Sequence, residues 1–224
     1  MSLTRRTFNA SLLTVATALA LIGSRPSVAQ SPWPAAPAQD VDVAELAKPV
    51  PLGDIVLGSA NAPVTVVEYA SLSCGHCAAF HETTYPMIKA EYIDTGKVRF
   101  IFREYPLDVK AAAASMVARC VGNGNAEKYH DAATKLFATQ DKWVQQDTAD
   151  QLQQAAGELG LDEEAFRTCI GNQATVDALR AGMAVANTRF KVDSTPTFFI
   201  NGTPLRGAYP IGEFRRLIEA KLKS

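Results

Sequence analysis

The four residues Cys74-Gly75-His76-Cys77 lie where a predicted strand is followed by a predicted helix. The strand is expected within residues 62–70, which are apolar and rich in β-branched side chains. The helix is expected over residues 78–92, with an interruption at Pro86. Two cysteines three positions apart on a first helical turn share a face, and a small local adjustment closes a disulfide between them. This spacing predicts a redox-active dithiol, with half of a zinc site or a purely structural bridge as the alternatives.

The composition limits the classes to which the chain can belong. Its 224 residues are 47% hydrophobic and 20% charged, which is typical of one globular domain. The net charge is −1 and no basic stripe is present, so nucleic-acid binding is not expected. The four cysteines divide into the close pair and a distant pair, Cys120 and Cys169, which fits an oxidising compartment.

The amino-terminal segment, residues 1–29, is typical of an export signal. Two arginines precede an apolar run over residues 10–23, which is short for a membrane span of roughly 20 residues. The small residues Ser27-Val28-Ala29 predict cleavage after Ala29. The stretch Thr4-Arg5-Arg6-Thr7-Phe8 resembles the twin-arginine export motif, although general secretion and an uncleaved anchor are alternatives. Because such signals mark bacteria, we expect the protein in the periplasm.

The next segments predict a lead-in followed by a sheet. Residues 30–51 are rich in Pro and Ala and predict an extended or disordered lead-in, with two helical turns at most over residues 42–48. This is too little for a long oligomerisation stalk, so we expect a monomer. Strands are then expected over residues 53–58, 64–69 and 97–103, the second covered on both faces. A helix between the last two predicts that they pair in parallel.

The rest of the chain predicts a helical insert and a return to the sheet. Five helices are expected, over residues 111–120, 127–138, 148–159, 162–170 and 175–190. Two strands around an Asn201-Gly202 turn and a closing amphipathic helix follow, over residues 195–200, 203–206 and 211–222.

In this order the segments resemble the DsbA family of thiol-disulfide oxidoreductases. The resemblance covers residues 54–224 and rests on three motifs and the helical insert; the motifs are Cys74-Gly75-His76-Cys77, Phe102-Arg103-Glu104-Tyr105-Pro106-Leu107 and Thr195-Pro196-Thr197-Phe198-Phe199-Ile200. It implies an α/β, thioredoxin-like fold over residues 52–106 and 191–224 with an inserted all-helical domain over residues 107–190. One departure is Gly75-His76: strongly oxidising members commonly have Pro-His, whereas Gly-His is typical of protein disulfide isomerases.

The cysteine pair and its histidine are the predicted catalytic residues. Cys74, at the helix start, is the expected nucleophile, because N–H groups and the helix dipole favour its thiolate. His76 is expected to tune it, and Cys77 to be the resolving partner. His81 and His130 are expected to be surface or packing residues without a role.

Further roles follow from the resemblance. Glu68 matches the buried acid that shuttles the proton of the resolving thiol; the alternative is a strand-end residue reaching solvent. Thr195 and Pro196 match the cis-proline dipeptide that binds an incoming peptide by strand addition; the alternative is an ordinary strand-initial proline. Cys120 and Cys169 match a structural disulfide, with two buried free thiols as the alternative.

Together these observations predict a periplasmic dithiol oxidase that donates the Cys74–Cys77 disulfide to newly exported proteins. A membrane partner resembling DsbB would reoxidise it, and neither a bound cofactor nor a metal is required. One rival is a disulfide isomerase or reductase on the same scaffold. The other is a metal-binding protein that uses Cys74, Cys77 and either His76 or His81.

Overall fold

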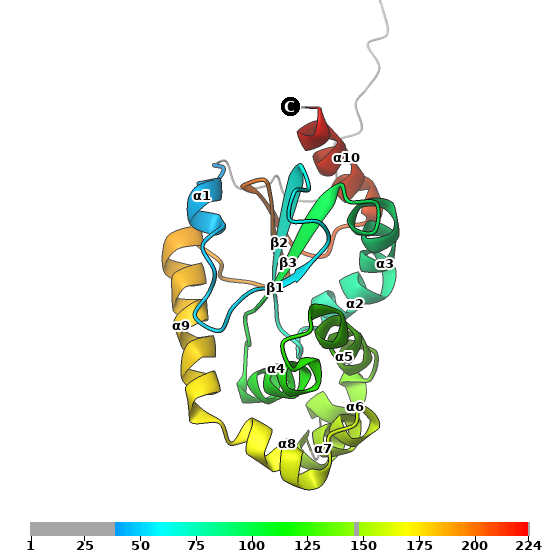
Figure 1. Cartoon of the computed structure of the whole chain (residues 1–224), viewed down its shortest axis with the longest axis vertical. Coiled ribbons are helices and arrows are strands. Elements are labelled where there is room, and N and C mark those ends of the chain that lie inside the picture. Colours follow the sequence, from blue (N-terminus) through cyan, green and yellow to red (C-terminus); the bar gives the residue numbers. More distant parts are fainter. Residues whose placement is uncertain (1–38, 146–147, 224) are drawn as a thin grey trace, which may run out of the picture. The chain divides into compact units, whose positions relative to one another are not determined.

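The computed structural model describes residues 39–145 and 148–223, so the predicted export signal and its cleavage site lie outside the described residues. Within them, the centre is a mixed sheet of five strands in the order β1-β3-β2-β4-β5 (Figure 1). The strands are β1 (Ile55–Leu57), β2 (Val64–Ala70), β3 (Val98–Glu104), β4 (Thr197–Ile200) and β5 (Thr203–Arg206). The predicted parallel pairing of β2 with β3 is confirmed, and β4 runs antiparallel to β2.

The two turn residues between β4 and β5 behave as the sequence predicts. Asn201 and Gly202 have φ values of 44° and 85°. Positive φ at both central positions is what a two-residue hairpin turn requires, which is why Asn-Gly is favoured there. This hairpin places β5 at the edge of the sheet.

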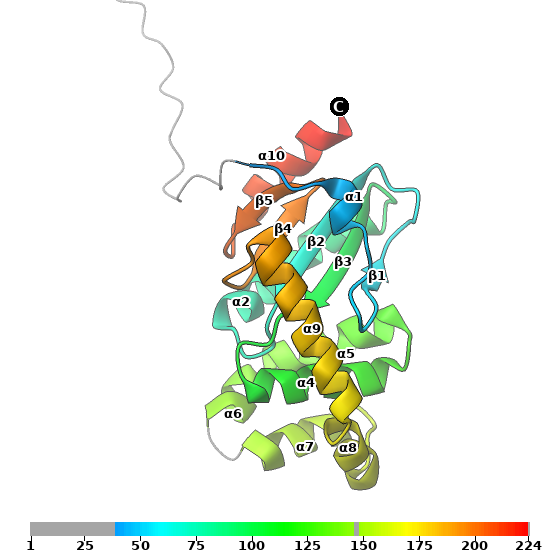
Figure 2. The same cartoon turned by 90° about the vertical axis from the view of Figure 1, so that its left-hand side faces the viewer.

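Helices cover both faces of the sheet, which explains its uniformly apolar central strand. One face of β2 and β3, with Val66 and Phe100, packs against α2 (Gly75–Thr83) and α3 (Tyr85–Ile88). The other face, with Val67 and Ile101, packs against α9 (Gln173–Phe190). Figures 1 and 2 show these two layers of helices on opposite sides of the sheet. The closing helix α10 (Ile211–Leu222) has the predicted bounds and packs on the first face.

The predicted helix over residues 78–92 is one continuous path of three pieces. It begins earlier, at Gly75, and α2 ends at Thr83, before Pro86. Because proline has no N–H and its ring clashes with the preceding turn, the helix restarts as α3 with Pro86 in its first turn. A π-helical turn, η1 (Lys89–Ile93), ends the path.

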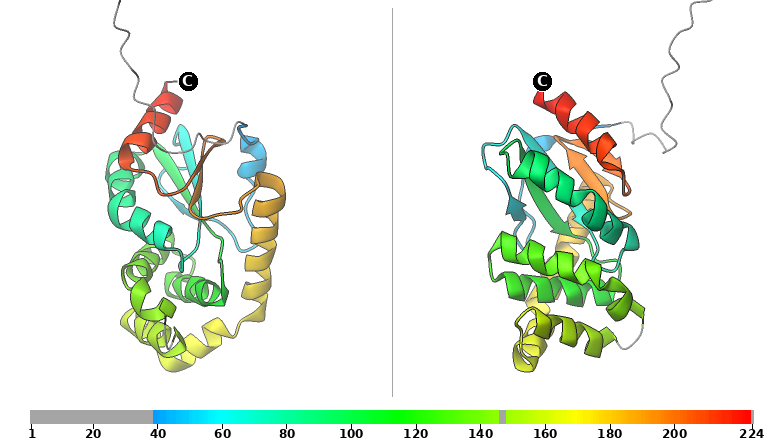
Figure 3. Two further views of the ribbon diagram at one scale, coloured as in Figure 1. Left: turned by 180° about the vertical axis from the view of Figure 1, so that it is seen from behind. Right: turned by 90° about the vertical axis from the view of Figure 1, so that its right-hand side faces the viewer.

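The insert contains the five predicted helices and a sixth that the sequence does not reveal. They are α4 (Val109–Gly122), α5 (Ala126–Ala138), α6 (Gln140–Gln145), α7 (Thr148–Glu158), α8 (Glu163–Ile170) and α9. The missed helix, α6, is polar and six residues long, too short for a helical period to be recognised. Its buried Trp143 donates to the Leu136 carbonyl oxygen at 2.9 Å. Figure 3 shows helices α4 to α8 beyond the ends of β2 and β3, whereas α9 runs back alongside the sheet.

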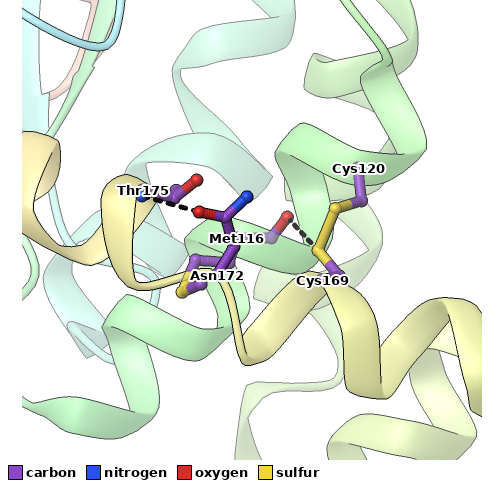
Figure 4. Close-up of a disulfide and its surroundings, with 5 residues drawn as sticks. All are labelled: Met116, Cys120, Cys169, Asn172 and Thr175. Atoms are coloured by element: carbon purple, nitrogen blue, oxygen red, sulfur yellow. Dashed lines mark hydrogen bonds between the residues drawn. A yellow bond between two sulfur atoms is a disulfide. The ribbon is translucent and has the colours of Figure 1, made fainter.

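A disulfide joins two helices of the insert. Cys120 on α4 and Cys169 on α8 are bonded, and the Cys169 sulfur lies 2.9 Å from the Met116 carbonyl oxygen (Figure 4). Just beyond Cys169, the Asn172 side chain caps α9 by accepting from the Thr175 N–H at 3.1 Å. The bond therefore holds the turn from which α9 returns to the sheet.

The structure describes residues 39–51 of the predicted lead-in; they contain one helical turn within residues 42–48, where two turns at most were expected, and they are packed against the sheet. The short helix α1 (Val43–Leu46) packs on the second face of the sheet, where Leu46 is 3% exposed. The Val41 N–H donates to the Gly202 carbonyl oxygen at 2.9 Å. Arg103 on β3 is buried and donates to the carbonyl oxygens of Leu46 and Lys48. A buried guanidinium needs acceptors, and this segment supplies them.

None of the helices that the structure describes is long and apolar enough to cross a membrane.

Candidate active site

The loop after β2 delivers Cys74 to the start of α2. Cys74 is the N-cap residue, with an extended backbone (φ −84°, ψ 117°), and it is 9% exposed. Its N–H donates to the Ser71 carbonyl oxygen at 3.0 Å. Gln140, on the missed helix α6, donates to the Leu72 carbonyl oxygen at 2.6 Å. The insert thus helps to fix the loop that carries the first cysteine.

A second set of hydrogen bonds ties the same loop to the start of α4. The Ser73 hydroxyl donates to one Asp108 carboxylate oxygen at 2.7 Å, and the Leu107 N–H donates to the Ser71 hydroxyl at 3.2 Å. The other Asp108 oxygen caps α4 by accepting from the Ala111 N–H at 2.7 Å. One aspartate therefore couples the position of the cysteine loop to the first turn of the insert.

The pKa values of the two cysteine thiols are shifted in opposite directions. A hydrogen bond from the Cys77 thiol is the largest cause that lowers the pKa of Cys74, from its ordinary 9.0 to about 5, against the effect of burial. The Thr195 side chain and the backbone N–H groups of Cys77 and His76 lower it further. Burial is the main reason why the pKa of Cys77 is raised, and the charges of Cys74 and Glu68 add to it. At neutral pH the reduced pair therefore holds one thiolate, on Cys74, and one thiol, on Cys77.

His76, between the two cysteines, contributes to the acidity of Cys74 through its backbone N–H. Its side chain is exposed, and its backbone N–H is one of several groups that lower the pKa of Cys74. A tuning role for the imidazole of His76 stays a prediction.

The predicted dipeptide, Thr195-Pro196, immediately precedes β4. The Thr195–Pro196 peptide bond is cis, and the Thr195 carbonyl oxygen lies 3.4 Å from the Cys74 sulfur. The Pro196 carbonyl oxygen accepts from the Gly207 N–H at 2.8 Å. The backbone of Thr195 therefore lies beside the Cys74 sulfur.

A buried acid–histidine pair lies between β2 and α2. Glu68 is fully buried, and the His81 Nε2 atom lies 3.0 and 3.2 Å from its two carboxylate oxygens. His81 is therefore not a surface residue: it packs among aromatic rings, as one of the two predicted alternatives has it, and it also pairs with Glu68, which was not predicted. His81 follows Cys77 by four positions and shares its helix face, and Glu68 is the single acid of an otherwise apolar strand; these two signals together could have revealed the pair.

His130 is also buried, which excludes its prediction as a surface residue and leaves packing. It stacks on Tyr85 at a ring distance of 5.7 Å, and its Nδ1 atom lies 3.3 Å from the Tyr85 hydroxyl. Burial lowers its pKa to about 3. His130 is therefore neutral at physiological pH.

The alternative of a metal site would use Cys74, Cys77 and either His76 or His81. Across residues 39–145 and 148–223, no group of three or more His, Cys, Asp or Glu side chains has the arrangement of a metal site. Cys120 and Cys169 are bonded to each other.

Comparison with known proteins identifies the chain's relatives. A family model described as thioredoxin matches residues 52–220. The crystal structure of α-DsbA1 from Wolbachia pipientis is 32% identical in sequence and superposes with a TM-score of 0.74, covering 81% of this chain and 96% of that one. The chain belongs to the DsbA family. The predicted family and the predicted fold class, thioredoxin-like with a helical insert, are thereby confirmed.

Other relatives differ more in length or sequence. A relative from Rickettsia typhi, provisionally named a protein-disulfide oxidoreductase, is 32% identical over 172 residues, which is 76% of this chain and 62% of that protein. The chain thus spans about three fifths of the length of the first Rickettsia relatives that it matches. BdbD from Bacillus subtilis is 22% identical with a TM-score of 0.69, covers 84% of this chain and 99% of its own, and supports the fold alone.

Proposed function

We propose that this DsbA-family protein is a periplasmic dithiol oxidase that transfers its Cys74–Cys77 disulfide to exported proteins. The observation that carries the proposal is the difference between the two sulfurs, a pKa of about 5 for Cys74 and a raised pKa for Cys77. A stabilised Cys74 thiolate is a good leaving group and stabilises the reduced protein, so giving up the disulfide is favourable.

The chemistry needs only thiol–disulfide exchange. A client thiolate attacks the Cys74 sulfur, the Cys74–Cys77 bond breaks, and Cys77 leaves as a thiolate that takes up a proton. A second client thiolate then attacks the client sulfur of the mixed disulfide, and Cys74 leaves as a stable thiolate. The client is oxidised by two electrons and the protein is reduced by two. No bound cofactor is needed for this exchange.

The size of the effect indicates the direction of transfer. Lowering a thiol pKa from 9.0 to about 5 stabilises the thiolate by about 5 kcal/mol, at about 1.36 kcal/mol per unit. At pH 7 an ordinary thiol is protonated, so only the interval between a pKa of about 5 and pH 7 stabilises the reduced protein, by about 2.7 kcal/mol. For a two-electron couple, about 1.4 kcal/mol corresponds to roughly 30 mV, so this effect alone raises the reduction potential by roughly 60 mV. Potentials of about −120 mV and about −270 mV are those of DsbA and thioredoxin, so a shift of this size favours an oxidant.

The neighbouring residues have supporting roles in this proposal. The backbone of Thr195 would pair with the client peptide, and Pro196, which lacks an N–H, would keep the edge beside Cys74 free of competing pairing. Glu68 would exchange a proton with Cys77, and His76 would tune Cys74. The bonded pair Cys120 and Cys169 would serve structure only.

The location and the partners follow from the sequence. The export signal predicted in residues 1–29, with cleavage after Ala29, supports a periplasmic location. The clients would be reduced exported proteins, and the protein would act on them as a monomer. A membrane partner resembling DsbB would accept the two electrons and restore the disulfide.

A disulfide isomerase or reductase on the same scaffold is the second candidate, and Gly75-His76 favours it. A Cβ atom added at Gly75 would meet only the Gln140 side-chain oxygen, at 3.9 Å, so local crowding does not impose the glycine. The dipeptide is therefore free to set the redox potential rather than the fold.

Equilibration with glutathione buffers decides between the two candidates. A potential near about −120 mV supports the oxidase, and one of about −180 mV or below supports the isomerase or reductase. The same preparation should oxidise a reduced, unfolded client faster than the Cys74→Ser variant does. Equal rates for the two proteins would refute both candidates.

A further inference from the structure

The Glu68–His81 pair is a buried polar group that the exchange reaction alone does not explain. Both side chains are nearly inaccessible, with His81 2% and Glu68 0% exposed. In the part of the chain that the structure describes, His81 is the hydrogen-bond partner of the Glu68 carboxylate, with both oxygens in reach of one nitrogen. Burying a carboxylate costs free energy unless a partner offsets the loss of water. For Glu68 this partner is largely the imidazole of His81.

The surroundings of His81 assign its hydrogen atoms. Nε2 faces the carboxylate and therefore carries the proton that is donated to it. Nδ1 is buried and has no hydrogen-bond partner among the described residues. The ring stacks on Phe137 at 4.5 Å and lies 4.8 Å from Tyr85. An imidazolium would place an unpartnered N–H in this aromatic shell, so the neutral ring with Nε2–H is the form that fits.

His81 lies on the face of α2 that carries the resolving cysteine, Cys77. Cys77 and His81 are four positions apart on α2 and share one face of the helix. Burial is the main reason why the pKa of Cys77 is raised, and the charge of Glu68 adds to it, which supports a carboxylate close to this thiol. Phe102 and Phe198, the strand partners of Glu68, carry no charge that could replace the imidazole.

We propose that His81 is a positioning residue for the resolving step, whose Nε2–H holds the Glu68 carboxylate in place and orients it to accept the Cys77 proton. This inference rests on the proposed thiol–disulfide exchange. In the step, the Cys77 proton passes to Glu68 and the Cys77 sulfur bonds to the Cys74 sulfur. The bond from Cys74 to the second molecule breaks, and that molecule leaves as a thiolate. In the opposite direction Glu68 returns the proton to Cys77.

Other titratable groups near the pair do not change charge in the working range. Burial lowers the pKa of His130 to about 3 and raises the pKa values of both tyrosines that face the site. The facing groups are Cys77 on α2, Tyr85 on α3, and Tyr129 and His130 on α5. Near neutral pH all four facing groups are therefore uncharged.

A reaction whose two phases can each be followed by absorbance separates this proposal from the proposed function. Reduced protein is mixed with dithiobis-nitrobenzoate, a symmetrical aromatic disulfide. Cys74 attacks it in a bimolecular phase, and Cys77 then resolves the mixed disulfide in a unimolecular phase; each phase releases one coloured thiolate. If the unmodified protein lacked a fast bimolecular phase, the proposed nucleophile, and not the role of His81, would be refuted.

The unimolecular phase tests His81. Glu68→Gln should slow it roughly 100-fold, as for loss of a general base. His81→Phe should slow it about tenfold at neutral pH, because the buried carboxylate then loses the N–H group that orients it. His81→Gln keeps an N–H donor and should stay within about threefold of the parent. His130→Phe changes a buried histidine whose hydrogen-bond partner is Tyr85 and not Glu68, and it should leave the phase unchanged.

Two results would overturn the proposal: a folded His81→Phe protein with the parent's rate, or a folded His81→Gln protein as slow as His81→Phe. If the phenylalanine variant does not fold, nitrogen NMR of histidine-labelled parent protein gives an independent answer. The expected spectrum shows His81 protonated at Nε2 and unprotonated at Nδ1 across roughly pH 5 to 8. Protonation of Nδ1 in that range would contradict the proposed neutral donor.

Discussion

The Cys74 sulfur lies 3.4 Å from the carbonyl oxygen of Thr195, a residue 121 positions later in the chain. The contact places the start of α2 against the start of β4, across the whole helical insert. An extended peptide that pairs with the Thr195 backbone would therefore bring its own sulfur to Cys74. The insert is attached to the same loop through Asp108 and Gln140, so it helps to hold the cysteine at this edge.

The acidity of Cys74 should depend most on its partner cysteine. The hydrogen bond from the Cys77 thiol is the largest cause of the lowered pKa of Cys74. Cys77→Ala removes this donor and should raise the pKa of Cys74, whereas Cys77→Ser keeps a hydroxyl donor and should raise it less. Alkylation rates of the single remaining thiol against pH give both values. Identical values for the two variants would show that the helix start alone sets the acidity.

The reduced protein should become more stable as pH rises. The pKa of Cys74 is about 5 in the folded protein and near its ordinary 9.0 when unfolded, so between these values only the unfolded chain binds the proton. The free energy of unfolding should then rise by up to about 1.4 kcal/mol per pH unit from pH 5 toward pH 9, and be lost as pH falls through 5. Urea unfolding of the reduced parent, compared with reduced Cys74→Ser, isolates this contribution. A difference that does not change with pH would contradict it.

Removing the second disulfide should affect stability and leave the exchange chemistry unchanged. The bond closes a sequence separation of 49 residues, for which chain entropy predicts a stabilisation of about 4 kcal/mol. The double variant Cys120→Ala/Cys169→Ala should unfold at lower urea concentration while its Cys74–Cys77 reduction potential stays that of the parent. A changed potential with little change in unfolding would mean that the bond acts on the active site.

Gly75→Pro should make the protein a stronger oxidant. Gly75 is the first residue of α2, where proline's missing N–H is not needed and its fixed φ suits the helix. The open space around Gly75 accommodates the change without repacking. Because the resemblance associates Pro-His with strong oxidants, the reduction potential should rise while the fold is kept. Gly75→Ala is the matched control for the loss of glycine, and an equal rise in both variants would exclude a specific effect of proline.

Much of the fold is predictable because its signals are local. The closing helix, 211–222, has apolar residues at helical spacing, and Asn201-Gly202 suits a turn that needs positive φ at two positions. Predictions fail where a polar group is buried by distant partners. Arg103 lies at a position where the alternating pattern of the strand predicts a solvent-facing side chain. Instead it is buried and donates hydrogen bonds to Asp54, Tyr69 and two carbonyl oxygens. No local pattern shows that those acceptors lie there.

The same reason explains which part of the site could be predicted. Cys74 and Cys77 are adjacent on one turn, so their spacing is sufficient to predict a dithiol. The contact between Glu68 and His81 joins a strand to a helix 13 residues away and depends on how the two pack. The role of α6 depends likewise on Gln140 reaching the Leu72 carbonyl oxygen, 68 residues earlier in the chain.

The central claim is that the fold holds the sulfur of Cys74 ionised. Its most direct test is a titration of the thiolate ultraviolet absorbance of the reduced protein, with Cys74→Ser as the blank. The account predicts a transition with a pKa of about 5 that is absent from the blank. A single transition near 9.0, the ordinary value for a thiol, would contradict it.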